Sequence, residues 1–232
     1  MNWPLLVVPV LAPLAFWAAY HYYHDRHRPE PVLNLVICLG LGVAAAYLNQ
    51  YMYLGLDALG LRYDAAHLAA TNLPGLFAYA VLGIGLTEEV AKLLPFLLVV
   101  LHFDAFDEPM DGIVYGSFLA LGFALIENLH YVQFLTATEA IARGFAGPLV
   151  HIVFASIWGY HIGRARLAGS GLLRATLLWL GVAAFVHGVY DFIVLGFSST
   201  ALVCAAAVIV AVWLWRLQLI RKLSAAAAEA PE

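Results

Sequence analysis

Charge is scarce in this chain. Only 11% of its 232 residues are Asp, Glu, Lys or Arg, whereas 64% are hydrophobic. Water-soluble domains typically carry about 25% charged residues. The composition therefore excludes an ordinary soluble domain and indicates an integral membrane protein.

Cysteine is almost absent as well, and the two that occur form no CxxC or other metal-ligand spacing. Because Cys38 and Cys204 both lie in apolar stretches, we expect them to be buried small hydrophobic residues. The chain also lacks an internal repeat, a Gly-rich phosphate loop and a basic tract. These absences argue against nucleotide or nucleic-acid binding.

Long apolar stretches dominate what is present. A membrane-spanning helix needs about 20 mostly apolar residues. The chain has seven such stretches, at about 3–20, 32–54, 74–101, 111–135, 145–163, 172–197 and 199–220. Helices are expected because the in/out alternation of a barrel strand is absent and every backbone amide in lipid must be paired. The sequence predicts an all-α, polytopic bundle of about seven transmembrane helices.

The stretches leave almost nothing for a soluble domain. We expect one membrane domain over 1–223 with its motif-bearing core at about 74–197, followed by a disordered Ala-rich tail at 224–232. The polar segment 57–72 is expected to be an external loop or a short surface helix. Pro95 is expected to kink or widen the third span.

Glycines recur at small-xxx-small spacing in two of the predicted spans. Gly112 and Gly116 form one pair, and Gly159 and Gly163 form the other. This spacing lets helix backbones approach closely in lipid. We expect these glycines to serve packing.

Basic residues predict the orientation in the membrane. With the N-terminus outside, the cytoplasmic segments hold Arg26, Arg28, Arg164, Arg166, Arg174, Arg216, Arg221 and Lys222, and the external segments hold only Arg62 and Arg143. The acidic segment 104–111 also falls inside, but acidic residues contribute little to orientation. We expect an N-out, C-in protein of a prokaryotic cytoplasmic membrane.

Carboxylates occur inside these apolar spans. They are Glu88, Glu89, Glu127 and Asp191, and Lys92 and His187 share their depth, with His151 close by. An ionisable group at bilayer depth costs at least about 2.5–3.5 kcal/mol on insertion scales. A polar site assembled between helices is therefore expected, reached by water most easily from outside.

The spacing of these residues along a helix suggests which of their side chains lie on the same face. Glu88 and Lys92 lie one turn apart on one face, so we expect them to pair and to leave Glu89 free. A purely structural ion pair explains the first two equally well, but it does not account for Glu89. His187 and Asp191 are also one turn apart, which suits joint metal coordination or a carboxylate that orients an imidazole.

The order of the motifs resembles a known family. The chain has EExxK (Glu88, Glu89, Lys92), DGxxYG (Asp111, Gly112, Tyr115, Gly116), FxxxEN (Phe123, Glu127, Asn128), His151 opening the fifth span, and HxxxD (His187, Asp191). This series is similar to the PrsW family of intramembrane proteases, within the superfamily of the CAAX prenyl endopeptidases and the Abi proteins. The resemblance runs from about Gly83 to Phe192.

The resemblance implies hydrolysis of a peptide bond in or near the membrane, in a membrane-anchored substrate such as a single-span anti-sigma factor. It implies a catalytic set of Glu88, Glu89, Lys92, Glu127, His187 and Asp191. Glu127 takes the place of a histidine of the prenyl endopeptidase branch, and Asp191 corresponds to asparagine there. These acidic replacements favour a bound cation.

Two mechanisms remain open at this stage. In one, a divalent metal, plausibly zinc, is held by some of Glu127, His151, His187 and Asp191, with Glu88 or Glu89 as general base. In the other, the glutamate activates water without a metal and His187 stabilises the oxyanion. A proton- or ion-coupled carrier would use similar residues, but the inverted repeats of transporters are not visible. A non-catalytic relative is disfavoured because every motif residue is present.

Overall fold

The computed structural model describes residues 3–24, 28–197 and 202–229, and all regular structure in these ranges is helical. The elements in chain order are α1 (Trp3–His24), α2 (Val32–Ala58), α3 (Ala65–Thr71), α4 (Leu73–Ala78), η1 (Tyr79–Gly85), α5 (Leu86–Leu98), η2 (Val100–His102), α6 (Pro109–Tyr131), η3 (Val132–Phe134), α7 (Ala137–Leu167), α8 (Leu172–Gly196) and α9 (Leu202–Glu229). Within the described part, α2, α6, α7, α8 and α9 are long and apolar enough to cross a membrane. The all-α prediction is confirmed, and five of the predicted spans meet these criteria.

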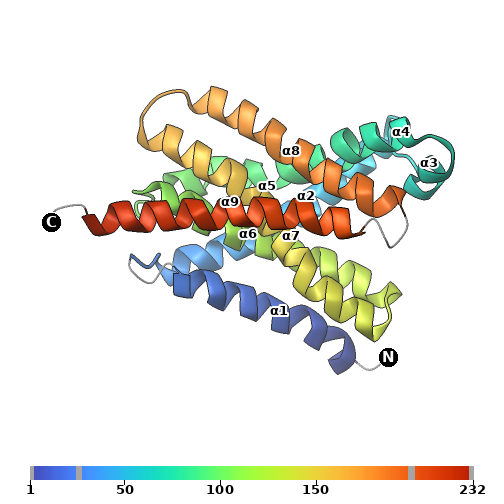
Figure 1. The fold of residues 1–232 in the computed structure, drawn as a ribbon, viewed down its shortest axis with the longest axis horizontal. Coiled ribbons are helices and arrows are strands. Elements are labelled where there is room, and N and C mark those ends of the chain that lie inside the picture. The colour runs from blue at the N-terminus through green and yellow to red at the C-terminus, as the bar shows by residue number, and fades with distance from the viewer. Residues whose placement is uncertain (1–2, 25–27, 198–201, 230–232) are drawn as a thin grey trace.

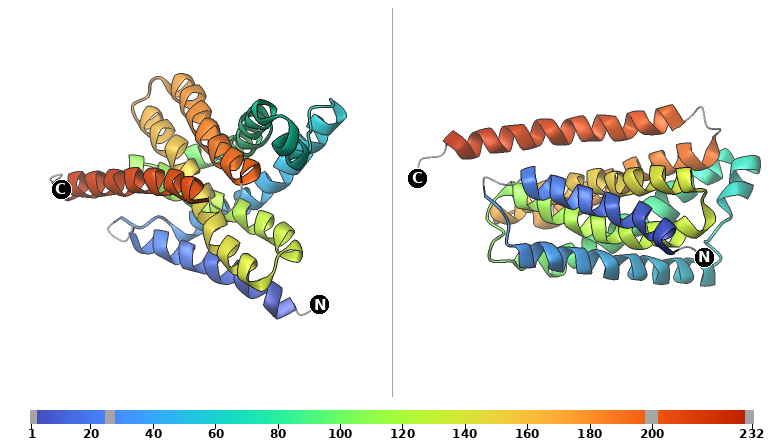
Figure 2. Two further views of the ribbon diagram at one scale, coloured as in Figure 1. Left: turned by 45° about the vertical axis from the view of Figure 1, so that its right-hand side comes forward. Right: turned by 90° about the horizontal axis from the view of Figure 1, so that it is seen from below.

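Helix α6 is the centre of the bundle. Its apolar window is 83% buried, compared with 22% in α8 and 17% in α9. Helices α2 and α7 flank α6, while α8 and α9 lie farther out (Figures 1 and 2). The axes of the long helices are roughly aligned with one another, and the two termini lie at opposite ends of the bundle (Figure 1).

Glycines allow the central helices to touch through their backbones. A Cβ added to Gly112 of α6 would collide with the carbonyl oxygen of Gly159 in α7, and the reverse also holds. Gly42 of α2 and Gly122 of α6 form a second contact of this kind. The predicted packing role is thus confirmed at Gly112 and Gly159, because no other residue fits where two backbones meet.

The predicted third span is a helical run of three parts. It begins as α4, continues as the π-helical segment η1 and ends as α5. The widening lies at Tyr79–Gly85, before the site, rather than at Pro95, which is accommodated within α5. A Cβ at Gly85 would lie 2.5 Å from the carbonyl oxygen of Ala184, so this run packs directly on α8.

Several boundaries differ from the prediction. Helix α7 begins at Ala137, where Thr136 and Glu139 form a capping box, so His151 lies in the middle of the helix and does not open it. Helix α9 continues to Glu229, into the expected tail, and residues 230–232 lie outside the described part. Cys38 is buried as predicted, but Cys204 is exposed.

A buried arginine fastens α9 to the bundle. The Arg216 side chain is 1% exposed. It donates hydrogen bonds to Ser156 of α7 and Ser117 of α6, and its Nη2 lies 3.1 Å from Nδ1 of His21 in α1. Arg216 is one of the basic residues expected on the cytoplasmic side, and in the structure its buried side chain joins helices.

The acidic segment after η2 lies beside a basic residue. The Arg28 guanidinium is 3.3 Å from Glu108 and 3.8 Å from Asp107. The charges of Asp107 and Glu108 raise the pKa of Arg28 above its usual value. Arg28 and this segment therefore occupy the same end of the bundle, as the predicted orientation requires. Arg26 lies outside the described residues.

We predict that Gly112→Ala lowers stability by about 1–3 kcal/mol, because the methyl group must push two helix backbones apart. Gly181→Ala in α8 is the matched control, since nothing lies within 4 Å of its added Cβ. The control should be neutral or gain up to about 1 kcal/mol from helix propensity. Thermal unfolding in detergent measures both, and equal melting temperatures would contradict the close contact.

Candidate active site

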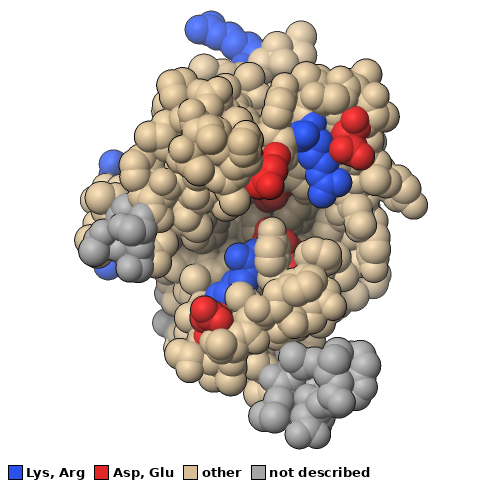
Figure 3. Space-filling model, turned by 90° about the vertical axis from the view of Figure 1, so that its right-hand side faces the viewer, with Lys and Arg blue, Asp and Glu red and all other residues tan. Residues whose placement is uncertain are grey.

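The predicted polar residues meet in one cavity of about 390 Å³. Helix α5 supplies Glu88, α6 supplies Glu127, α7 supplies His151, and α8 supplies His187 and Asp191. The face at the end that carries α3 and α4 is hollowed, with acidic and basic side chains around the hollow (Figure 3). The predicted common cavity is confirmed for these five residues.

Glu89 is not part of the cavity wall. Its carboxylate is fully buried and accepts hydrogen bonds from Lys92 at 2.6 Å and from the Trp158 indole at 2.8 Å. Nδ1 of His187 lies 2.8 Å from the same carboxylate. Both oxygens of Glu89 are thus engaged by buried partners, and its carboxylate is held away from the cavity.

The predicted pair of Glu88 with Lys92 is wrong. Lys92 pairs instead with Glu89, three residues away, and both side chains are 0% exposed. Residues three and four apart both share a helix face, so spacing alone could not choose between them. The choice follows from the neighbours, because only Glu89 points to the side where Trp158 and His187 provide further donors.

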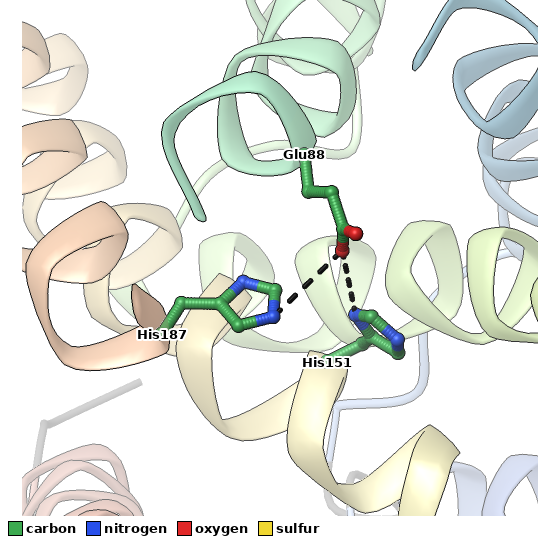
Figure 4. Close-up of side chains that lie close together, drawn as sticks. All are labelled: Glu88, His151 and His187. Atoms are coloured by element: carbon green, nitrogen blue, oxygen red, sulfur yellow. Dashed lines mark ion pairs between the residues drawn. The ribbon is translucent and has the colours of Figure 1, made fainter. Parts of the chain in front are cut away.

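Glu88 therefore faces the cavity. Its Oε2 lies 3.7 Å from Nε2 of His187 and 3.9 Å from Nδ1 of His151, and it is buried without a hydrogen-bond partner (Figure 4). Its Oε1 accepts a hydrogen bond from Tyr53 at 3.4 Å. In the described residues, Glu88, His151 and His187 form a group that could hold a metal ion, with one ligand atom each within 4.8 Å of the others.

Each of the two histidines has a carboxylate at its far ring nitrogen. Glu127 lies 2.6 Å from Nε2 of His151, and Glu89 lies 2.8 Å from Nδ1 of His187. An ionised carboxylate only accepts hydrogen bonds, so these nitrogens carry the protons. The lone pairs of the other two nitrogens then point towards Glu88.

Three acceptor atoms consequently converge at Glu88. Lone pairs and a carboxylate oxygen repel one another unless a positive charge lies near them. Lys92 contributes part of that charge, since its Nζ is 3.3 Å from Nδ1 of His151. A divalent cation fits the same arrangement, because protein metal ligands commonly include histidines whose second nitrogen donates to a carboxylate.

Asp191 and Arg143 complete the charged lining. Oδ2 of Asp191 lies 3.5 Å from Nε2 of His187 and is buried without a hydrogen-bond partner. Arg143 lies 3.3 Å from Glu127 and stacks over the Tyr131 ring at 3.9 Å. The acidic side of the cavity is therefore partly balanced by a guanidinium.

Sequence reasoning missed three contributors to this site. Trp158 and Tyr53 were indistinguishable from core aromatics in apolar spans. Arg143 was noted only as an external charge. Its place next to Glu127 depends on how α7 packs on α6, which no local pattern reveals.

The DGxxYG residues lie away from the cavity. Asp111 accepts hydrogen bonds from the backbone of Asp107 and Glu108 and caps α6. Tyr115 donates a hydrogen bond to Glu30. Asp111 lies about 24 Å from Glu127 along the helix, at about 1.5 Å per residue. Because this motif caps and packs α6 far from the cavity, its role is structural.

Comparison with known proteins agrees with the geometry. A family model described as "PrsW family intramembrane metalloprotease" matches residues 18–217. No solved structure matches the chain.

Curated relatives match over most of their length. Protease PrsW of Oceanobacillus iheyensis is 34% identical over 83% of this chain and 84% of its own. Protease PrsW of Geobacillus kaustophilus is 31% identical over 82% of this chain and 80% of its own. Protease PrsW of Shouchella clausii is 31% identical over 92% and 95%, respectively. With the family model covering most of the sequence, the chain belongs to the PrsW family of intramembrane metalloproteases.

Proposed function

We propose that this protein is a metal-dependent endopeptidase that hydrolyses a peptide bond of a membrane-anchored protein substrate. The observation that carries the proposal is that His151 and His187 converge on a buried carboxylate oxygen of Glu88 that has no hydrogen-bond partner among the described residues. The site lies in a cavity between helices that are long and apolar enough to span a membrane. A bond at membrane depth could reach these groups there.

Glu88, His151 and His187 would hold the metal. Mixed nitrogen and oxygen donors favour zinc, which would act as a Lewis acid to activate water and polarise the scissile carbonyl. Glu127 and Glu89 would orient the two imidazoles from their far nitrogens. This assignment differs from the expected ligand set, because Glu127 contacts His151 on the side away from Glu88.

Asp191 is the best-placed general base. Its buried Oδ2 has no hydrogen-bond partner and lies beside His187 at the cavity wall. A free acceptor in this position can take a proton from the attacking water. Glu89, which was expected to compete for this role, would instead be a positioning residue that acts through His187.

We infer the orientation of the protein in the membrane from its basic residues. Adding α1 and the run α4–η1–α5 to the five apolar helices gives seven crossings, with the N-terminus outside and the C-terminus in the cytoplasm of a prokaryotic cell. Arg62 and Arg143, the external basic residues, both line the cavity. The cavity would then open to the external side. The protein would cleave a single-span substrate, for example one resembling an anti-sigma factor, in the outer half of the bilayer.

We predict that Glu88→Gln loses both the metal and cleavage, because a ligand is removed. Asp191→Asn should retain the metal but cleave at least about 100-fold more slowly, since the amide cannot accept a proton. Elemental analysis and a cleavage assay in liposomes measure the two properties. Full activity of exhaustively chelated, metal-free protein would contradict the metal and favour Glu88 as an unaided base.

We predict that Glu89→Gln destabilises the protein by about 3–5 kcal/mol, because it leaves the Lys92 ammonium buried without a counter-charge. The double variant Glu89→Gln/Lys92→Met should recover much of this loss, since both charges are absent. Thermal unfolding in detergent compares them. An unchanged melting temperature for Glu89→Gln alone would show that the pair is not held as described.

We predict that a cysteine at position 62 reacts with a membrane-impermeant reagent added outside, whereas a cysteine at position 174 does not. The labelling requires a Cys204→Ala background, because Cys204 is exposed while Cys38 is buried. Both sites are exposed helix ends or loops. Labelling of Arg174→Cys from outside intact cells would reverse the proposed orientation.

A further inference from the structure

A second cavity of about 420 Å³ lies next to the active site. It is lined by the end of α2, the segment before α3, and α3, α4 and η1. Helices α3 and α4 lie at the right-hand end of the bundle in Figure 1. Its lining is mostly apolar and includes Leu56, Leu61, Leu68, Asn72, Ala78 and Leu82. Among the described residues, no charged side chain lines it, in contrast to the catalytic cavity. We call it the apolar pocket.

Two tyrosines separate the apolar pocket from the catalytic cavity. Tyr63 and Tyr79 line both spaces. Their rings meet edge to face with centroids 5.6 Å apart. The apolar pocket therefore adjoins the catalytic cavity at this aromatic pair.

The backbone positions one of these tyrosines. A Cβ added to Gly83 would lie 2.5 Å from the Tyr79 ring, so the ring rests on the bare backbone of the next turn. Both residues belong to the π-helical segment η1, which leads directly into Glu88. Single π-helical turns are frequent at functional sites. The wall of the apolar pocket and the catalytic carboxylate are thus parts of one helical run.

We propose that the apolar pocket receives a large apolar side chain of the substrate, next to the bond that is cleaved, and so selects the cleavage position. The inference rests on the proposed function and adds a specificity site to it. An extended polypeptide directs successive side chains to opposite sides, so one of them would point from the catalytic cavity towards Tyr63 and Tyr79. The volume exceeds the lower limit of about 300 Å³ for ligand pockets.

The lining decides the chemistry of the occupant. Leucines and glycines offer contact area and almost no hydrogen-bonding partners, so a polar or charged side chain would lose its hydration there. A leucine or phenylalanine side chain would bury its surface instead. The wall that it shares with the catalytic cavity, Tyr63 and Tyr79, favours a substrate side chain over a lipid chain.

Ala78→Trp tests the proposal by filling the apolar pocket. Ala78 is exposed on α4 and lines this pocket but not the catalytic cavity. Ala44→Trp is the matched control, because Ala44 is exposed on α2 and lines neither space. The substrates are single-span peptides in phosphatidylcholine liposomes. Mass spectrometry first identifies the bond that is cleaved. The peptides are then made identical except for Ala, Leu or Phe at each of the positions flanking this bond.

The wild-type protein should cleave the Leu or Phe peptide about 10–200-fold more efficiently in kcat/KM than the Ala peptide at one flanking position. Ala78→Trp should abolish this preference, so that the Leu and Phe peptides are cleaved no more efficiently than the Ala peptide, which is still cleaved. Ala44→Trp should keep the preference. Leu68→Ala, which enlarges the same pocket, should shift the preference towards Phe and provides the test if Ala78→Trp does not fold.

The outcomes separate this inference from the proposed function. Equal cleavage of the Ala, Leu and Phe peptides by the wild type would overturn the specificity site and leave the protease intact. Cleavage of none of the peptides would contradict the proposed function and this inference with it. In the Glu88→Gln variant, a photoreactive phenylalanine at the preferred position should label the segment 56–83. Labelling only outside this segment would overturn the specificity site. It would also be overturned if the wild-type protein retains a lipid that Ala78→Trp loses while the preference among the peptides is unchanged.

Discussion

The arrangement of the site depends on the carboxylate of Glu89. Its hydrogen bonds join α5 to Trp158 of α7 and to His187 of α8, and it neutralises the buried Lys92. Removing one partner of such a pair leaves an uncompensated charge at membrane depth, which is far more costly than the pair itself. Because these contacts engage both oxygens of Glu89, the neighbouring Glu88 is the carboxylate that faces the cavity.

Close helix contacts make these hydrogen bonds possible. Gly85 of η1 packs against the backbone of α8, and Gly188 of α8 packs against Val81 in return. This brings His187 within reach of Glu89 and Glu88. In lipid, where burial of apolar surface does not drive helices together, such contacts between small residues are a main source of packing energy. The same residues that hold the bundle together therefore set the distances in the site.

The two histidines share one arrangement. Each donates one ring proton to a carboxylate and directs its other nitrogen towards Glu88. A carboxylate in that position fixes the tautomer and raises the basicity of the ligand nitrogen. Glu127 is the carboxylate that contacts His151 in this way.

The sequence by itself determined the membrane class, the helical fold and the polar residues that meet in the cavity, because scarce charge and long apolar runs leave few alternatives for groups such as Glu127 and Asp191. It could not decide whether Lys92 pairs with Glu88 or Glu89, since both spacings share a helix face. Nor could it place Trp158, Arg143 or the apolar pocket. Those depend on rotations and contacts between helices that are distant in sequence, and only tertiary packing selects among them.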